Sequence, residues 1–157
     1  MKDICVFFGT GYEEIEALTV VDILRRGGLP VKMVSITGEY NVTSSHQVTV
    51  KMDALFDEID FEQVEAFDKA GRPISAICAA PSILGHRGML KGRDACSFPE
   101  FESHLEGANV LKQPAVVSDH ITTGRGMGAA IEFGLAILGR YQGKEAAEKM
   151  AKKIVYR

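Results

Sequence analysis

The hydrophobic positions of this chain fall into short apolar runs that alternate with segments of helical spacing. Residues 4–8 form the first apolar run and predict a buried strand, which Gly9-Thr10-Gly11 ends. Apolar residues recur every three or four positions over about residues 13–26, which predicts a helix that stops at Gly27-Gly28. The apolar positions of this helix are Ile15, Leu18, Val21 and Leu24. With a second apolar run at residues 31–36, the first third predicts a β-α-β unit with parallel strands.

The remainder of the chain continues this alternation. Residues 42–52 alternate weakly between apolar and polar positions, which predicts a hairpin or short edge strands. Residues 74–77 form another apolar run, and a helix is predicted after it at about residues 80–90. Two short strands around a turn and two closing helices are predicted at residues 115–118, 121–124, 127–141 and 144–153. Strands that alternate with helices indicate an α/β sandwich with a mostly parallel sheet.

Residues 55–71 do not fit this alternation. They are acidic, have helical character and contain no apolar run. A second β-α-β crossover needs a strand ahead of the one at residues 74–77, and the sequence offers none there. The pattern therefore predicts a sheet that is one strand short.

Length and composition indicate a single globular domain over residues 1–157, because this length is enough for one core and too short for two. Apolar residues make up 46% and charged residues 25%, and no apolar stretch is long enough to cross a membrane. The net charge of −3 provides no basic field, so nucleic acid is not an expected partner. Three scattered cysteines form no disulfide framework and no secretory leader is visible, so we expect a cytoplasmic protein.

Cys78 lies at the joint between the strand at residues 74–77 and the helix that follows. A sharp strand-to-helix turn resembles a nucleophile elbow, although the G-x-S-x-G signature is absent. Backbone N–H groups and the helix dipole at such a turn favour the thiolate, the reactive form of cysteine. The alternative is a small buried cysteine that packs like any other apolar residue. The turn alone leaves both interpretations open.

Glu16 is the carboxylate best placed to meet Cys78. Glu13 and Glu14 open the first helix, where acidic residues usually complement the helix dipole. In a parallel sheet the start of this helix and the joint at Cys78 both lie at the carboxyl ends of the strands, where ligands bind. A carboxyl group there would hydrogen-bond the sulfur or act as a general acid or base. On spacing alone, a solvent-exposed helix face is the more ordinary interpretation of Glu16.

The remaining candidates are weaker. His46 has polar neighbours and is the histidine best suited to line a site. The histidines and cysteines are not spaced as metal ligands, so no metal is expected. The Gly-rich stretches at residues 9–11 and 124–128 lack the rest of a nucleotide-binding signature, so no cofactor is expected. Of the other cysteines, Cys5 is predicted to pack inside its strand. Partial exposure of Cys96 is left open, and nothing around it suggests activation.

Five stretches carry a resemblance to a known family. They are Gly11-Tyr12-Glu13-Glu14-Ile15-Glu16-Ala17, Val21-Asp22-Ile23-Leu24-Arg25-Arg26-Gly27-Gly28, Ala76-Ile77-Cys78-Ala79-Ala80-Pro81, Thr123-Gly124-Arg125-Gly126 and Ala130-Ile131-Glu132-Phe133-Gly134-Leu135-Ala136-Ile137. In order and identity they resemble the ThiJ/PfpI superfamily, in the branch of the Parkinson-associated protein deglycase and its bacterial relatives. The stretches span nearly the whole chain, which makes the match specific.

The resemblance implies a flavodoxin-like three-layer sandwich of the class I glutamine amidotransferase type, usually assembled as a homodimer. It implies a reactive, readily oxidised Cys78 and a protonated Glu16 in contact with its sulfur. Ala79 would then supply a backbone N–H to an oxyanion. The residues predicted to contact the substrate are Gly11, His46, Arg125 and Gly126.

The chain departs from the family in three places. Phe98 stands where some members carry a histidine, which argues against a histidine-assisted mechanism. Ala79 stands where protease-like members carry a histidine, so peptidase activity is not expected. The family also has an apolar strand and a Pro-Gly-Gly loop where this chain passes from Phe61 to Glu62. We therefore expect that a segment is missing at about residues 61–62, and with it the second N–H of the oxyanion pocket.

The resemblance implies cofactor-independent glyoxalase or deglycase activity on α-oxoaldehydes or their adducts, with Cys78 as nucleophile and Glu16 as general acid and base. A different class of function is also open, namely a redox sensor or holdase chaperone in which oxidation of Cys78 is the signal. A third alternative is a non-catalytic amidotransferase-like domain, which would show neither a hyper-reactive thiol nor aldehyde turnover.

Overall fold

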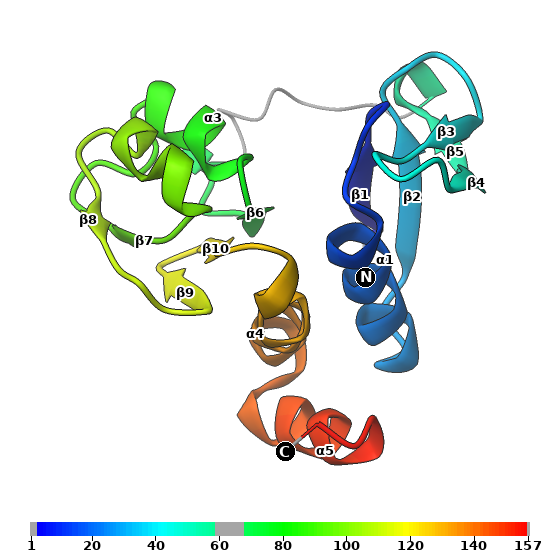
Figure 1. The fold of residues 1–157 in the computed structure, drawn as a ribbon. Helices are drawn as coiled ribbons and strands as arrows, with labels where there is room; N and C mark the ends of the chain where they lie inside the picture. Colours follow the sequence, from blue (N-terminus) through cyan, green and yellow to red (C-terminus); the bar gives the residue numbers. More distant parts are fainter. Residues whose placement is uncertain (1–2, 59–67, 157) are drawn as a thin grey trace.

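The computed structural model describes residues 3–58 and 68–156, in which strands and helices alternate (Figure 1). The first unit consists of β1 (Ile4–Phe8), α1 (Glu14–Arg26) and β2 (Val31–Ser35). β1 and β2 pair in parallel along their whole lengths. The predicted β-α-β unit is therefore confirmed.

A hairpin and a very short strand follow β2. β3 (Asn41–Thr43) and β4 (Thr49–Lys51) are antiparallel, as the weak alternation over residues 42–52 predicts. β5 (Ala54–Leu55) pairs in parallel with β2 and completes the strand order β1-β2-β5, after which η1 (Phe56–Glu58) forms a 3₁₀ turn. Two residues are too few to show an alternation, so the sequence does not reveal β5.

The second sheet has the order β6-β10-β9. β6 (Ile74–Ile77) and β10 (Ile121–Gly124) are parallel, and β9 (Ala115–Ser118) joins β10 in the antiparallel direction. All three strands occupy the predicted ranges. The sheet therefore places the carboxyl ends of β6 and β10 side by side, directly ahead of Cys78 and Arg125.

The helix after β6 is shorter than predicted. α3 spans Pro81–His86 and does not continue to residue 90. Gly88 adopts a φ of 70°, a left-handed conformation that terminates helices, and its N–H donates to the carbonyl of Gly85 at 2.8 Å. The Met89 N–H donates back to the Leu84 carbonyl at 3.0 Å. The prediction of a helix over residues 80–90 is wrong for its second half because this glycine cap intervenes.

The last third combines short irregular elements with two helices. β7 (Asp94–Ala95) pairs in parallel with β8 (Asn109–Val110). The other elements of this part are η2 (Pro99–His104), η3 (Met127–Ala129), α4 (Ala130–Gln142) and α5 (Lys144–Lys153). The two predicted closing helices are thus confirmed, the first with a 3₁₀ turn in place of its opening residues. Among the described residues, no helix combines the length and the apolar character that a membrane crossing requires.

The main hydrophobic core lies where α1 packs against α4 and against β1 and β2. Gly134 of α4 permits this close approach, because a Cβ at this position would lie 2.8 Å from Cδ1 of Ile23 in α1. Ile77 of β6 also packs against this core, so α1 and α4 connect the two sheets (Figure 1). A second core joins β6, α3, β7 and β10 through Ala76, Leu84, Leu90, Ala95 and Ile121.

The described strands form two three-stranded sheets and two two-stranded ones, and the two larger sheets are not joined into one. β1 is the end strand of the first sheet and β6 is the end strand of the second. Within the described ranges, no strand pairs with the outer edge of either. The segment predicted to be missing at about residues 61–62 falls outside the described residues, between these two sheets in the sequence.

Candidate functional site

Cys78 occupies the sharp turn that the sequence predicts. Its φ is 64°, a left-handed conformation that costs a non-glycine residue roughly 1–3 kcal/mol. Two backbone hydrogen bonds hold this turn: the Cys78 N–H donates to the Gly124 carbonyl at 3.0 Å, and the Phe98 N–H donates to the Cys78 carbonyl at 2.9 Å. Neighbouring β10 and the loop before η2 thus fix an elbow that projects the thiol from the sheet edge.

Glu16 lies on the buried face of α1, with 7% of its surface exposed. Glu13 is the N-cap of this helix, and its carboxylate accepts the Glu16 N–H at 2.6 Å. The buried face then continues through Val20, Ile23 and Leu24, whereas Ile15 is 50% exposed. The ordinary interpretation of Glu16 as solvent-exposed is wrong. Of the predicted apolar face, Ile15 is exposed, whereas Val21 and Leu24 are buried as predicted.

The carboxyl group of Glu16 and the thiol of Cys78 share a hydrogen bond. Burial raises the pKa of Glu16, the hydrogen bond with Cys78 opposes this effect, and the nearby charge of Glu13 adds to it. The sequence predicts that Glu13 only complements the helix dipole. In the structure Glu13 also positions Glu16 and favours its protonated form.

The pKa of Cys78 is raised to about 11. Burial of the thiol is the largest cause, followed by the hydrogen bond to Glu16 and the charge of that carboxylate. The Ala79 N–H donates to the sulfur and lowers the pKa, as the elbow predicts. Because α3 begins only at Pro81 and has six residues, this single N–H is outweighed. A Glu16 that holds a proton removes the opposing charge, so the two groups compete for one proton.

Gly126 and Phe98 border this pair. Gly126 has φ 157° and ψ −170°, a backbone region that essentially only glycine adopts. A Cβ at Gly126 would lie 3.3 Å from Cδ2 of Phe98 and 3.8 Å from Oε1 of Glu16. The predicted site residue Gly126 is thus next to Glu16. The sequence draws attention to Phe98 only as the residue that replaces a histidine, whereas the structure makes its ring a neighbour of the site.

The contacts of Arg125 lead away from Cys78. Its guanidinium forms an ion pair with Glu102 at 3.2 Å, and its N–H donates to the Pro114 carbonyl at 2.9 Å. Burial raises the pKa of the Cys96 thiol, and the charge of Arg125 is one of the effects that oppose this rise. The structure therefore places this predicted substrate contact on the Cys96 side of the turn after β10.

Gly11 and His46 lie together near the beginning of α1. The Gly11 N–H donates to the Thr43 carbonyl at 2.9 Å, which fixes the β3–β4 hairpin against this loop. His46 is 71% exposed, and its Nδ1 lies 3.0 Å from the Glu14 carboxylate. These two predicted contacts thus form a rim beside α1, and their own hydrogen bonds do not involve Cys78.

One group of side chains has the spacing of metal ligands. Glu13, Glu14 and His46 each offer one ligand atom, and these atoms lie within 4.8 Å of one another. His46 is exposed and already forms an ion pair with Glu14, while Glu13 accepts the Glu16 N–H. Capping and surface electrostatics therefore account for this group.

The other two cysteines differ from Cys78 in their surroundings. Cys96 is fully buried, its Sγ donates to the Thr123 carbonyl at 3.4 Å and its N–H donates to the Thr123 hydroxyl at 3.0 Å. The sequence leaves partial exposure of Cys96 open, and the structure buries this residue directly after β7. Cys5 is half-buried within β1, where burial and the charge of Asp3 raise the pKa of its thiol.

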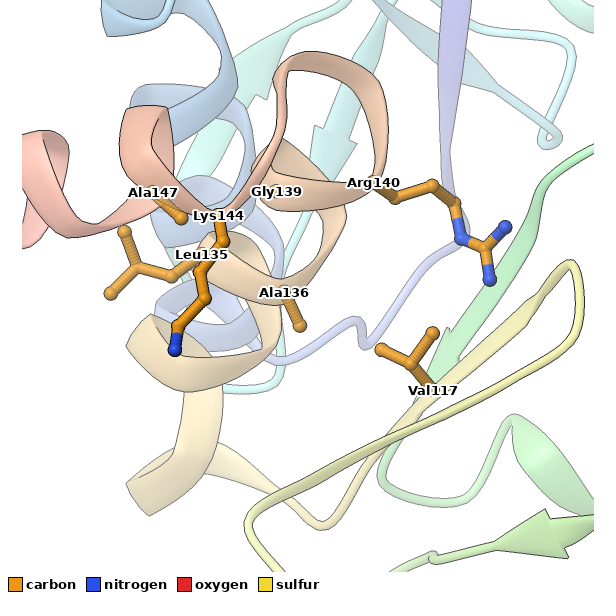
Figure 2. Close-up of a pocket in the computed structure, with 7 residues that line it drawn as sticks. All are labelled: Val117, Leu135, Ala136, Gly139, Arg140, Lys144 and Ala147. Carbon is orange, nitrogen blue, oxygen red and sulfur yellow. The ribbon is translucent and has the colours of Figure 1, made fainter.

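Two surface cavities lie away from this site. One, of about 470 Å³, lies between α4, α5 and β9, where apolar side chains separate the two basic residues Arg140 and Lys144 (Figure 2). The other, of about 570 Å³, lies between α1, β2 and β4. The candidate site is therefore defined by Cys78, Glu16 and their neighbours rather than by the volume of a cavity.

Comparison with known proteins places this geometry in a family. A sequence model described as the DJ-1/PfpI family matches residues 2–68 and 61–140. The chain is 28% identical to the DJ-1 homolog B of Arabidopsis thaliana over 95% of its length, and it spans 40% of that relative. It is 29% identical to a glutathione-independent glyoxalase of Caenorhabditis elegans, over 90% of the chain and 89% of the relative.

Two shorter matches carry other names. A deglycase of Pyrococcus horikoshii is 26% identical over 63% of this chain and 74% of its own length. A putative cysteine protease of Bacillus subtilis is 26% identical over 79% of this chain and 89% of its own length. The names of the relatives therefore point to more than one activity.

The fold comparison agrees with the sequence comparison. The structure of oxidised DJ-1 from Toxoplasma gondii superposes with a TM-score of 0.93 and 28% identity, over 99% of each chain. This likeness confirms the predicted α/β sandwich of the flavodoxin-like type. The family match over most of its length, together with this superposition, shows that the chain belongs to the DJ-1/PfpI family.

Proposed function

We propose that this chain is a cysteine-dependent, cofactor-independent enzyme of the glyoxalase and deglycase type, acting on α-oxoaldehydes or on their adducts. The observation that carries the proposal is the hydrogen bond between the buried Glu16 carboxyl and the half-exposed thiol at the Cys78 elbow. This is a nucleophile next to a group that can accept and return its proton. The relative named as a glyoxalase supports the same class of substrate.

The first step is addition of Cys78 to the aldehyde carbon. Glu16, as a carboxylate, accepts the thiol proton while the S–C bond forms and the carbonyl electron pair moves onto oxygen. The Ala79 N–H, which points at the sulfur, donates to this oxyanion. Return of the proton from Glu16 to the oxygen gives a neutral hemithioacetal.

The second step moves a proton between two carbons. Glu16 removes the proton from the former aldehyde carbon, and the electron pair forms a C=C bond to the neighbouring ketone carbon, which gives an enediolate with its negative charge on the former ketone oxygen. The hydroxyl proton of the hemithioacetal passes to that oxygen. Glu16 then returns its proton to the second carbon while the remaining oxyanion re-forms a carbonyl, which yields a thioester of a 2-hydroxy acid on Cys78. Water then adds to the thioester and releases the acid and the thiol. Methylglyoxal and water together equal lactate, so the atoms and electrons balance without an external oxidant.

The experiment is turnover of methylglyoxal by the wild-type chain and by two matched variants, with lactate as the product measured. Cys78→Ser removes the nucleophile, and Cys96→Ser removes a buried thiol that lies outside the proposed chemistry. We expect the first variant to lose turnover and the second to retain it. Full turnover by Cys78→Ser would refute the proposal.

The same geometry supports a second candidate, a redox sensor or holdase in which Cys78 is oxidised to a sulfinate. Cys78 is more accessible than Cys96, and an acidic partner is in place to hydrogen-bond the added oxygens. Each of two peroxide molecules would transfer one oxygen to the sulfur and leave as water. This candidate requires no aldehyde turnover, so the lactate measurement separates it from the first.

Assembly and location belong to the proposal as well. We expect a cytoplasmic homodimer without peptidase activity, since Ala79 follows the cysteine where a protease would have a histidine. Light scattering checks the assembly, and a dimer gives twice the chain mass of 17.1 kDa. Hydrolysis of a casein substrate would contradict the absence of peptidase activity.

A further inference from the structure

We propose that Phe98 is a specificity-determining residue, and that its ring together with Gly126 forms an apolar wall that selects uncharged α-oxoaldehydes with an aryl or alkyl substituent. This inference rests on the proposed function and adds a substrate class to it. Three features support this wall: the position of Phe98, the close approach of Gly126 to Phe98 and Glu16, and the charges around Cys78.

The position of Phe98 is fixed by the backbone of the nucleophile itself. Its N–H donates to the Cys78 carbonyl at 2.9 Å, so a change in the elbow moves both residues together. Its own carbonyl accepts the Phe101 N–H at 2.9 Å and the Ser97 hydroxyl at 3.1 Å. The backbone that carries this aromatic side chain, which is 39% exposed, is therefore held beside the elbow.

Gly126 lies between this ring and Glu16 and keeps the two close together. A Cβ there would stand 3.3 Å from the Phe98 ring, a crowded contact, and 3.8 Å from the Glu16 carboxylate. The backbone at Gly126 thus has an aromatic edge on one side and the proton-carrying group on the other. A substrate whose carbonyls reach Glu16 and Cys78 would place its substituent against the ring of Phe98.

The charges around Cys78 disfavour an anionic substituent. The charges that act on its thiol are the carboxylates of Glu16 and Glu13. Arg125, which follows β10, is committed to its ion pair with Glu102 at 3.2 Å. A carboxylate on the substrate would meet like charge at the site and an apolar ring beside it, whereas an aryl group would gain contact with the ring.

The test measures kcat/KM for phenylglyoxal, 4-carboxyphenylglyoxal and methylglyoxal, with formation of the 2-hydroxy acid as readout. The first two substrates differ by one charge at the same reacting group. We expect the wild-type chain to prefer phenylglyoxal over its carboxylated analogue by about tenfold or more. Phe98→Ala should lower kcat/KM for phenylglyoxal by roughly three- to tenfold and leave methylglyoxal nearly unchanged, with Phe98→Leu in between.

The matched control is Phe56→Ala, which changes an exposed phenylalanine of η1 whose ring centroid lies 6.1 Å from that of Phe7. It should leave all three values unchanged. An equal loss for all three substrates in Phe98→Ala would refute the proposed role of Phe98. Equal turnover of both arylglyoxals by the wild type would refute it as well.

If the wild-type chain turns over none of the three, the proposed function fails, and protection of Cys78 against iodoacetamide decides the inference separately. Phenylglyoxal should then protect better than its carboxylated analogue, and Phe98→Ala should reduce that difference. Equal protection by both aldehydes in the wild type would refute the proposed selection of uncharged substrates by Phe98.

Discussion

The carboxyl group of Glu16 hydrogen-bonds the thiol of Cys78, although α1 connects strands of the first sheet and the elbow follows β6 of the second. The two groups carry one negative charge between them whether the proton lies on oxygen or on sulfur. Burial disfavours both charged forms, so the position of the proton depends on the N–H that Ala79 donates to the sulfur and on the charge of Glu13 near Glu16. Changing Glu16 therefore changes the acidity of Cys78.

The first prediction concerns the pH dependence of Cys78 alkylation. With a pKa of about 11, roughly one thiol in ten thousand is ionised at pH 7, and the rate rises about tenfold per pH unit toward the pKa. Glu16→Gln removes the carboxylate charge that raises this pKa, so its inflection should move to lower pH. Iodoacetamide labelling from pH 6 to 11, followed by peptide mass spectrometry, measures both profiles.

Cys96→Ser serves as the control in this labelling, because Cys96 is fully buried and its loss should leave the Cys78 profile unchanged. The opposite result is equally informative. A wild-type inflection below the ordinary thiol value, which rises in Glu16→Gln, would mean that Glu16 holds the proton and stabilises a thiolate.

The second prediction is that Glu16→Gln stabilises the fold while it abolishes turnover. Burial raises the pKa of Glu16, so its contribution to stability is fully present below the unfolded pKa and is lost as pH rises through the folded pKa. At pH 7–8 a neutral amide avoids this loss, and Tm should rise by roughly 2–4 °C, as about 1 kcal/mol gives in a domain of this size. Thermal unfolding at pH 4.5 and pH 8 should show the gain only at the higher pH.

Neighbouring residues suffice to predict the elbow at Cys78, but not the burial of Glu16. The turn at Cys78 is encoded by an apolar run followed directly by a helix start, and both lie within a few residues. Glu16 is different, because apolar spacing assigns Ile15 to the buried face, whereas the structure exposes Ile15 and buries Glu16. Burial of a carboxyl group depends on the partner that tertiary packing supplies, here Cys78, and apolar spacing does not record that partner.

Other parts of the site depend on distant contacts. Phe98 reaches the elbow through one backbone hydrogen bond to Cys78, from a loop without strand or helix periodicity. Cys96 is buried because the two-residue strand β7 pairs with β8, and neither strand is long enough to show an alternation. The importance of Phe98 and Cys96 is therefore evident from their tertiary contacts and not from their residue types.

The third prediction concerns the selectivity of oxidation. Titration with hydrogen peroxide should add two oxygens to Cys78 before Cys5 changes, and Cys96 should stay reduced until the protein unfolds. The reason is that Cys78 combines partial exposure with a proton acceptor in Glu16. Peptide mass spectrometry after stepwise additions gives the order. Simultaneous oxidation of all three thiols would argue against a tuned site at Cys78.

The fourth prediction concerns the tight packing of Gly124, at the end of β10, against Phe133 of α4. A Cβ at Gly124 would lie 2.8 Å from the ring of Phe133 and 2.9 Å from Ile77. Gly124→Ala should therefore destabilise the fold by about 1–3 kcal/mol through overpacking. Gly128→Ala is the matched control, since a Cβ there has no neighbour within 4 Å. Urea unfolding measures both, and an equal cost in the two variants would contradict the packing argument.

The fifth prediction concerns the edges of β1 and β6 that no strand pairs within residues 3–58 and 68–156. Interior parallel strands are ordinarily paired on both sides, and exposed edges favour aggregation. The alignment with the Arabidopsis relative is 175 columns long yet covers 95% of 157 residues, or about 149, so about 26 columns face no residue of this chain. The family model also matches in two pieces that meet at residues 61–68. We propose that the natural protein contains a further segment there, which supplies the strand between β1 and β6.

Intact mass spectrometry of the protein from its natural source decides this proposal. We expect a mass above 17.1 kDa, by the mass of about 26 residues, with tryptic peptides that place the addition near residues 61–62. Restoring such a segment should also raise Tm, because it would pair both open edges and cover the sheet between the two cores. A natural mass of 17.1 kDa for one uncut chain would refute the missing segment, and the two sheets would then be a property of the protein itself.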